Sequence, residues 1–312
     1  MFWGLDNILN KYLTYIKFNG FVLITRECDV LLYKKYGKGI KENLSYPLAS
    51  LTKQFTAAAI NELVSTTSVT LDTKICDIYC KKCRVKDVSI RDLVTMRSGI
   101  ADYLNDSSYK ERLKKIIDLY DSRRVKEQII IDMLNNKTKF KSGTKVEYSN
   151  SNYYLIGDII EQVTDMSFEC YLKNTIFKNF DLRETFFWHG YETEKEAYYI
   201  KKSLPYELTY SACGLYSTPD NFRMWVFGYL KSNIKRIIEG DYEYNWGLQI
   251  NKKRKIVSHS GATLAQNMNF IYDYEKDILI YTWNAESKKF DAYEITTNIY
   301  KTMDSYIRRC AF

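Results

Sequence analysis

Residues 50–64 read SLTKQFTAAAINELV, and this stretch decides the fold prediction. Four apolar residues recur on one face at helical spacing: Phe55, Ala58, Ala59 and Leu63. Glu62 interrupts this face only near its end. We therefore predict a long, buried helix that begins at Ser50.

The first turn of this helix carries a candidate catalytic pair. Ser50 and Lys53 are three residues apart, so their side chains leave the same face of the helix. Unpaired N–H groups at a helix start favour negative charge developing on a substrate. We expect partial burial to lower the pKa of Lys53 until it accepts the serine proton at neutral pH. The pattern predicts a nucleophile with its base beside it.

The same Ser-x-x-Lys spacing occurs elsewhere in this chain, at Ser107, Ser142 and Ser232. Those three serines lie in polar stretches, whereas Ser50 alone opens a long apolar helix. Such a helix can hold a lysine in a dry, fixed position, which favours Ser50 as the nucleophile.

Two further motifs follow downstream. Tyr148-Ser149-Asn150 offers a phenol to relay protons and a carboxamide to hold a substrate amide, and His259-Ser260-Gly261 leads a strand that can form one wall of a cleft. Each also recurs: Tyr103 with Asn105 repeats the first pattern, and residues 141–143 resemble the second. The conjunction of all three motifs, in order, carries the prediction.

The surrounding pattern predicts an α+β fold. Strand-like runs occur near both ends, at residues 21–25, 30–36, 244–250, 255–258, 268–272 and 278–283. Helical runs occupy residues 90–96, 109–119, 125–134, 153–163 and 291–308, and an amphipathic N-terminal helix carries Leu5, Ile8, Leu9, Leu13 and Ile16. We expect one domain of two lobes, a sheet lobe at about 1–65 and 205–312 and an inserted helical lobe at about 66–204. The site would lie in the cleft between them.

The chain resembles the serine β-lactamase and penicillin-binding protein superfamily, and within it the class C β-lactamase-like esterases and peptidases. Besides the three motifs, similar phrases extend over almost the whole length. They are FNGFVLI at 18–24, YPLASLTKQFTAAAI at 46–60, DLVTMRSGIADY at 92–103, YSNSNYYLIGDIIEQVT at 148–164, SACGLYSTPDNFRMW at 211–225 and YNWGLQI at 244–250. The resemblance implies a β-lactamase/transpeptidase-like fold, with an antiparallel sheet built from both termini and flanked by helices.

The resemblance also implies a role for each motif residue. Ser50 resembles the acylated nucleophile, Lys53 its base and Tyr148 a second proton-transfer group. The implied substrate-binding residues are Asn150, His259, Ser260, Gly261 and Ala262. His259 stands where many relatives have lysine, and the backbone N–H groups of Ser50 and Ala262 would form the oxyanion hole.

The chain departs from the family pattern at three places. Relatives usually continue after the third motif with more glycine and an aromatic residue, whereas residues 262–266 read ATLAQ here. We expect this change to reshape the cleft wall. Ser142 before Gly143 and Asp165 after Thr164 replace small or rigid residues, and we expect both changes to be structural and harmless.

Composition limits the partners and the compartment. The net charge is +8, but basic residues are interleaved with acids, and the runs at 252–255 and 231–236 accompany no nucleic-acid motif. No apolar run is long enough to span a membrane and the start lacks the pattern of a signal peptide. Seven cysteines without a paired framework favour reduced thiols. We predict a cytoplasmic protein with no nucleic-acid or membrane partner.

Several alternatives stay open. Cys76, Cys80 and Cys83 have a CxxxCxxC spacing that can hold an iron–sulfur cluster, although Lys82 stands where an aromatic is usual and unpaired thiols are the simpler interpretation. The chain has two histidines, which is too few for a multi-histidine zinc site. A Ser-His-Asp triad that uses His259 remains possible from the sequence.

We expect no metal or organic cofactor and a small-molecule or peptide substrate, in peptide or secondary-metabolite tailoring. A non-catalytic binding or sensor module is the alternative to an enzyme. Esterase, D-amino-acid peptidase, transacylase and weak β-lactamase activity are not separated by the sequence, and neither is the oligomeric state.

Overall fold

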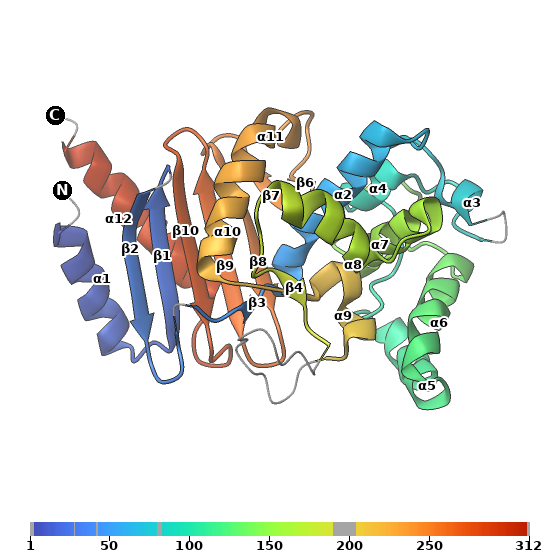
Figure 1. The fold of residues 1–312 in the computed structure, drawn as a ribbon, viewed down its shortest axis with the longest axis horizontal. Helices are drawn as coiled ribbons and strands as arrows, with labels where there is room; N and C mark the ends of the chain where they lie inside the picture. The colour runs from blue at the N-terminus through green and yellow to red at the C-terminus, as the bar shows by residue number, and fades with distance from the viewer. Residues whose placement is uncertain (1–2, 28, 42, 80–82, 190–203, 311–312) are drawn as a thin grey trace.

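The computed structural model describes residues 3–27, 29–41, 43–79, 83–189 and 204–310. In this part of the chain a large antiparallel sheet has the strand order β2-β1-β10-β9-β8-β7-β6 (Figure 1). Its strands are β1 (Gly20–Arg26), β2 (Asp29–Tyr36), β6 (Tyr244–Asn245), β7 (Leu248–Asn251), β8 (Ile256–Ala262), β9 (Asn267–Asp273) and β10 (Ile278–Asn284). A smaller sheet joins β3 (Tyr46–Pro47), β5 (Leu215–Ser217) and β4 (Phe186–Phe187).

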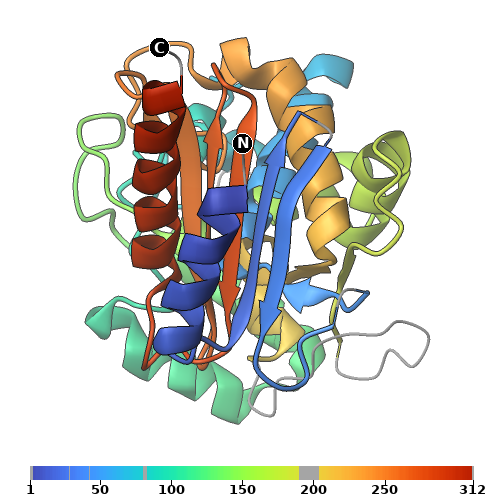
Figure 2. The same cartoon turned by 90° about the vertical axis from the view of Figure 1, so that its left-hand side faces the viewer.

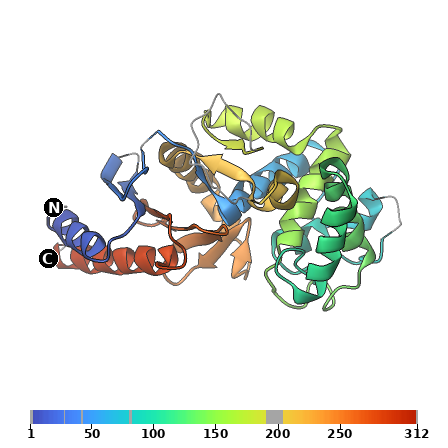
Figure 3. The same cartoon turned by 90° about the horizontal axis from the view of Figure 1, so that it is seen from below.

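Both faces of the large sheet are covered by helices. α1 (Trp3–Tyr15) and α12 (Ala292–Cys310), from the two ends of the chain, lie side by side on one face (Figures 2 and 3). α10 (Pro219–Trp225), η3 (Val226–Leu230) and α11 (Lys231–Ile237) cover the other, where the ring of Phe222 lies 4.5 Å from that of Tyr281. This double cover explains why β10 is apolar at nearly every position.

Side chains alternate between the two cores along each central strand. In β1, Phe21 and Leu23 join the main core, whereas Val22 and Ile24 join the core under α1 and α12. In α1 only part of the expected face is buried, since Ile8 is 52% exposed.

The remaining helices gather at the other end of the molecule (Figure 1). They are α2 (Thr52–Thr66), α3 (Ile75–Ile78), α4 (Ile90–Val94), α5 (Ser107–Leu119), α6 (Ser122–Asn135), α7 (Asn150–Thr164), α8 (Phe168–Leu172), η2 (Lys173–Phe177) and α9 (Tyr206–Cys213). α2 packs against α7 and α9 in the main core. The α+β class and the sheet built from both termini are confirmed, while the lobe boundaries at 65 and 205 stay a prediction.

One expected strand is broken by a turn. Residues 244–250 form β6 and β7, which pair through Tyr244 with Gln249 and Asn245 with Leu248. Trp246 and Gly247 lie between them with φ of 51° and 76°. Two consecutive positive φ values suit a tight two-residue hairpin turn, which the alternation of apolar residues does not reveal.

Asp165 is the C-cap of α7 and has φ 54°. A short polar side chain tolerates this left-handed conformation better than most residues, so Asp165 can stand where relatives have a smaller residue.

The expectation of reduced cysteines is wrong for one pair. Cys76 in α3 and Cys83 are joined by a disulfide, and these sulfurs are therefore not free thiols or metal ligands. Their short separation in sequence gave no sign of a paired framework. Cys80 lies outside the described residues.

Gly247 offers a test of how closely the β6–β7 turn approaches the helix of the candidate nucleophile. A Cβ added there would lie 2.6 Å from the backbone carbon of Lys53 and 2.6 Å from the backbone nitrogen of Gln54. We expect Gly247→Ala to lower the free energy of unfolding by about 3 kcal/mol, combining overpacking with backbone strain.

Gly39→Ala is the matched control, because Gly39 also has positive φ but its Cβ would meet nothing within 4 Å. It should cost about 1 kcal/mol. Denaturant unfolding measures both, and equal losses would contradict the close approach.

Candidate active site

Ser50 lies in a short 3-10 turn, η1 (Ala49–Leu51), immediately before α2. The backbone of β5 fixes this turn on both sides: the Leu48 N–H donates to the Leu215 carbonyl at 2.8 Å, and the Leu215 N–H donates to Thr52 Oγ1 at 3.1 Å. Ala49 has φ 44°, a strained value for a residue with a side chain. The serine therefore sits on a constrained turn rather than inside the helix.

Lys53 is completely buried one turn further along. Its Nζ donates to Ser50 Oγ at 3.1 Å, to Asn150 Oδ1 at 2.7 Å and to the Ala212 carbonyl at 3.0 Å. Three acceptors match the three N–H bonds of an ammonium group. They come from three separate segments, so Lys53 joins η1, α7 and α9.

Tyr148 reaches the same serine from the loop before α7. Its OH donates to Ser50 Oγ at 3.0 Å, and Lys53 Nζ lies 5.1 Å from the centre of its ring. The side chain is 41% exposed, but its oxygen points into the site. The competing Tyr103 is buried and donates instead to the Leu208 carbonyl.

Both the oxygen and the nitrogen of the Asn150 carboxamide form hydrogen bonds. Oδ1 accepts from Lys53, and Nδ2 donates to Asp102 Oδ2 at 2.9 Å. A lysine only donates and a carboxylate only accepts, so this orientation of the amide is unambiguous. In this geometry Asn150 positions Lys53, and its implied contact with a substrate amide stays a prediction. The sequence analysis missed Asp102, which lies inside a family-like phrase without a motif of its own.

β8 brings the third motif beside the nucleophile. A Cβ on Gly261 would lie 2.9 Å from the Leu48 carbonyl oxygen and 3.2 Å from Ala49 Cβ, so only glycine allows the strand this close to the serine turn. His259, Ser260, Gly261 and Ala262 all line the same cleft as Ser50.

The β8–β9 connection follows directly after this strand. Thr263 N–H donates to the Gln266 carbonyl at 2.9 Å, which closes a tight turn where relatives have glycine.

His259 does not pair with Ser50. Its Nε2 lies 3.1 Å from Tyr244 OH and its Nδ1 lies 2.6 Å from the Ser260 carbonyl oxygen. Both ring nitrogens therefore have hydrogen-bond partners other than Ser50, and the structure does not form a Ser-His-Asp triad through His259.

The expectation of a lowered pKa for Lys53 is wrong. Burial is the largest single effect and lowers its pKa, but Cys213, Tyr148 and Asp102 raise it, and together they outweigh burial. Burial also raises the pKa of Tyr148, against the opposing effect of Lys53. The resting site thus holds an ammonium and a neutral phenol, both donating to Ser50.

His259 is neutral over the physiological range. Burial, followed by the charge of Lys53, lowers its pKa to about 3. A histidine in the unfolded chain takes up a proton below about pH 6.5, so the unfolded state binds more protons between these values and the folded state loses stability as pH falls.

We expect the free energy of unfolding to fall by about 1.4 kcal/mol per pH unit from this group as pH drops below about 6. His259→Gln should remove that contribution, whereas His189→Gln, at the other histidine, should keep it. Denaturant unfolding at pH 4.5 and 7 measures the difference. If the free energy of unfolding falls by the same amount between pH 7 and 4.5 in wild type and in His259→Gln, His259 is not a buried, neutral histidine.

Cys213 is a second residue that the sequence analysis missed. Its Sγ lies 3.7 Å from Ser50 Oγ and 3.7 Å from Lys53 Nζ, and it lines the cleft. It ends α9, one residue after the carbonyl that accepts from Lys53. Cys213 lies inside the family-like phrase at 211–225 but has no motif of its own, because only the fold brings α9 against α2.

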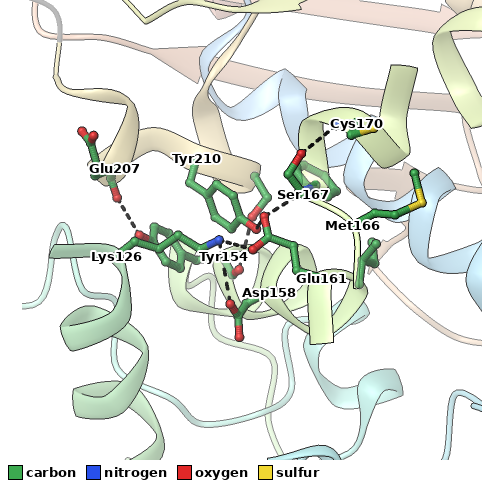
Figure 4. Close-up of polar contacts among 12 residues, drawn as sticks. Lys126, Tyr154, Asp158, Glu161, Met166, Ser167, Cys170, Glu207 and Tyr210 are labelled. Atoms are coloured by element: carbon green, nitrogen blue, oxygen red, sulfur yellow. Dashed lines mark hydrogen bonds and ion pairs between the residues drawn. The ribbon is translucent and has the colours of Figure 1, made fainter. Parts of the chain in front are cut away.

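A partly buried polar cluster contacts α9 (Figure 4). Tyr210 OH donates to Glu161 Oε1 at 2.6 Å, Lys126 forms an ion pair with Glu161, and Lys126 Nζ lies 4.1 Å from the centre of the Tyr210 ring. Tyr210 has φ 32° and ψ −137° inside the helix. The cluster stabilises this kink, which directs the last turn of α9 toward Lys53.

The cleft has a volume of about 1050 Å³. Ser50, Tyr148, Asn150 and Cys213 lie in its wall, whereas Ser107, Ser142 and Ser232 do not. The structure therefore separates the four Ser-x-x-Lys matches and selects Ser50. In the part of the chain that the structure describes, no group of three His, Cys, Asp or Glu side chains could hold a metal ion, and none of its helices is both long and apolar enough to cross a bilayer.

This fold, with a buried lysine and a tyrosine that both contact one serine in the wall of a cleft, defines the class of the serine β-lactamases and penicillin-binding proteins. The chain belongs to the Beta-lactamase family, whose model matches residues 5–297. The superfamily expected from the sequence is confirmed.

Known proteins agree with this assignment. The chain is 27% identical to Penicillin-binding protein 4* of Bacillus subtilis, over 86% of this chain and 69% of that protein. It is 28% identical to Protein flp of Staphylococcus aureus over 65% of this chain, but the match spans only 42% of that protein. A penicillin-binding protein from Bacillus halodurans has the same fold, with a TM-score of 0.76 at 19% identity, covering 94% of this chain and 98% of that one.

Proposed function

We propose that this hydrolase works through an acyl-enzyme on Ser50, with Lys53 and Tyr148 as its proton-transfer groups. One observation carries the proposal: Lys53 Nζ and Tyr148 OH lie 3.1 and 3.0 Å from the same serine oxygen. Hydrogen-bond contact between a nucleophile and its proton acceptor is the geometry that such catalysis needs.

The reaction has two balanced steps. Ser50 Oγ bonds to the substrate carbonyl carbon while its proton passes to the Lys53–Tyr148 pair, after that pair has lost one proton. The N–H groups of Ser50 and Ala262 would hold the negative carbonyl oxygen. The tetrahedral intermediate then expels the leaving group, which takes the proton, and water releases the acyl group by the same route.

The substrate is an ester, amide or peptide. Membership of a hydrolase family supports this range, as does the name of the penicillin-binding relative. The alternative of a non-catalytic sensor has no observation in its favour, because nucleophile, lysine and tyrosine are all in contact.

No compartment is proposed. The cytoplasmic location expected from the sequence depended in part on reduced cysteines, and the disulfide between Cys76 and Cys83 is of a kind found mainly in oxidising compartments.

Intact-protein mass after incubation with a fluorophosphonate probe tests the nucleophile. We expect one adduct on wild type, none on Ser50→Ala, and labelling slowed at least 100-fold in Lys53→Met, which keeps an unbranched side chain of nearly the same length without the amine. Ser107→Ala is the matched control, since Ser107 has the same spacing to a lysine outside the cleft.

A penicillin adduct in a parallel incubation would show that the cleft accepts β-lactam amides, and released penicilloate without a lasting adduct would indicate β-lactamase activity. Folded wild type that takes neither reagent would overturn the proposed mechanism.

The pH dependence tests the protonation state. Since the pKa values of Lys53 and Tyr148 are both raised, the reactive form gains population as pH rises. We expect kcat/KM for p-nitrophenyl acetate to increase about tenfold per pH unit from pH 7 toward 9. Cys213 raises the pKa of Lys53, so Cys213→Ala should move this rise to lower pH. A rate that is flat above pH 7 would contradict the ammonium assignment.

A further inference from the structure

The cleft wall formed by the helices carries a group of aliphatic side chains beside the polar Asn105, Asn150 and Thr209. Leu113 and Ile117 stand four residues apart on α5 and so present one face of that helix, and both line the cleft. Leu104, before α5, and Leu208, on α9, continue this wall. Leu264, in the β8–β9 turn, and Tyr293, at the start of α12, add apolar surface from the sheet side.

Several of these side chains are exposed without a packing role. Twelve large hydrophobic residues are exposed in the described part of the chain. Five of the twelve line this cleft: Ile117, Tyr148, Leu204, Leu264 and Tyr293. Single exposed apolar residues are ordinary, but their concentration in one hollow next to a nucleophile marks a binding surface.

The described lining offers no cation to a substrate. Among the described residues that line the cleft, Asp291 is the one Asp, Glu, Lys or Arg, and His259 is neutral because burial lowers its pKa. Lys53 Nζ is buried and already donates to three acceptors. Among the described residues, a carboxylate on the substrate would lose its hydration here without gaining a free positive partner.

We propose that this cleft selects substrates whose acyl group is long, apolar and uncharged, an inference that rests on the proposed function. The catalytic serine opens onto a volume larger than an acetyl group requires, and aliphatic and aromatic side chains form a large part of its lining, beside polar groups such as Asn105, Thr209 and Asn267. Each methylene buried against such a wall can raise kcat/KM by up to about fourfold. A terminal carboxylate on the same chain would remove this gain.

The test uses p-nitrophenyl acetate, butyrate, hexanoate and octanoate, together with the mono-p-nitrophenyl ester of octanedioic acid. After subtraction of the rate with Ser50→Ala, we expect kcat/KM to rise at least tenfold from acetate to octanoate. The octanedioate ester, with a carboxylate at the far end of an equally long chain, should be at least tenfold slower than octanoate.

Ile117→Asp should cut the octanoate rate at least fivefold while changing the acetate rate less than twofold. Leu119→Asp is the matched control, because Leu119 is also exposed on α5 but does not line the cleft. It should leave both rates unchanged.

The two proposals fail in different ways. Absence of fluorophosphonate labelling at Ser50 would remove the proposed function itself. Normal labelling with no preference for longer chains, with an equal or faster octanedioate ester, or with Ile117→Asp indistinguishable from Leu119→Asp, would overturn the apolar specificity alone.

Discussion

The buried ammonium group of Lys53 is the interaction on which the rest of the site depends. An unpaired charge in a protein interior is very costly, so the chain must supply acceptors from several directions. It does so with the Ser50 hydroxyl, the Asn150 amide and the Ala212 carbonyl. These lie on segments more than 60 residues apart in sequence. Satisfying one cation therefore fixes the relative position of η1, α7 and α9.

The contacts around these acceptors hold them in position beside Lys53. Asp102 holds the Asn150 amide so that its oxygen faces the lysine. Glu161 and Lys126 hold Tyr210, whose kink directs the end of α9. Gly247 and Gly261 allow two parts of the large sheet to approach the backbone around Ser50. Polar networks and glycine contacts thus act together to place a small number of atoms within hydrogen-bonding distance.

Local sequence patterns predicted most of the fold and part of this site. Helical spacing predicted α2 and strand-like runs predicted β1, β9 and β10, because each signal lies within one element. The motifs around Ser50, Tyr148 and His259 were found for the same reason. Asp102, Cys213 and the Lys126–Glu161–Tyr210 cluster were missed, since their roles arise only from contacts between distant segments. The prediction for the pKa of Lys53 was wrong because its burial could be inferred from sequence, whereas the opposing effects of Cys213 and Asp102 could not.

Observation of the Lys53 ammonium itself is the most direct test of how this site is held together. Lysine side-chain ¹H–¹⁵N spectra of the resting protein at neutral pH should show a protected NH₃⁺ signal that is absent in Lys53→Met. The signal should persist to alkaline pH, as a charge stabilised by three acceptors and a raised pKa requires. A Lys53 amine that is already neutral at pH 7 would contradict the account and restore the simpler picture of a lysine whose pKa is lowered by burial.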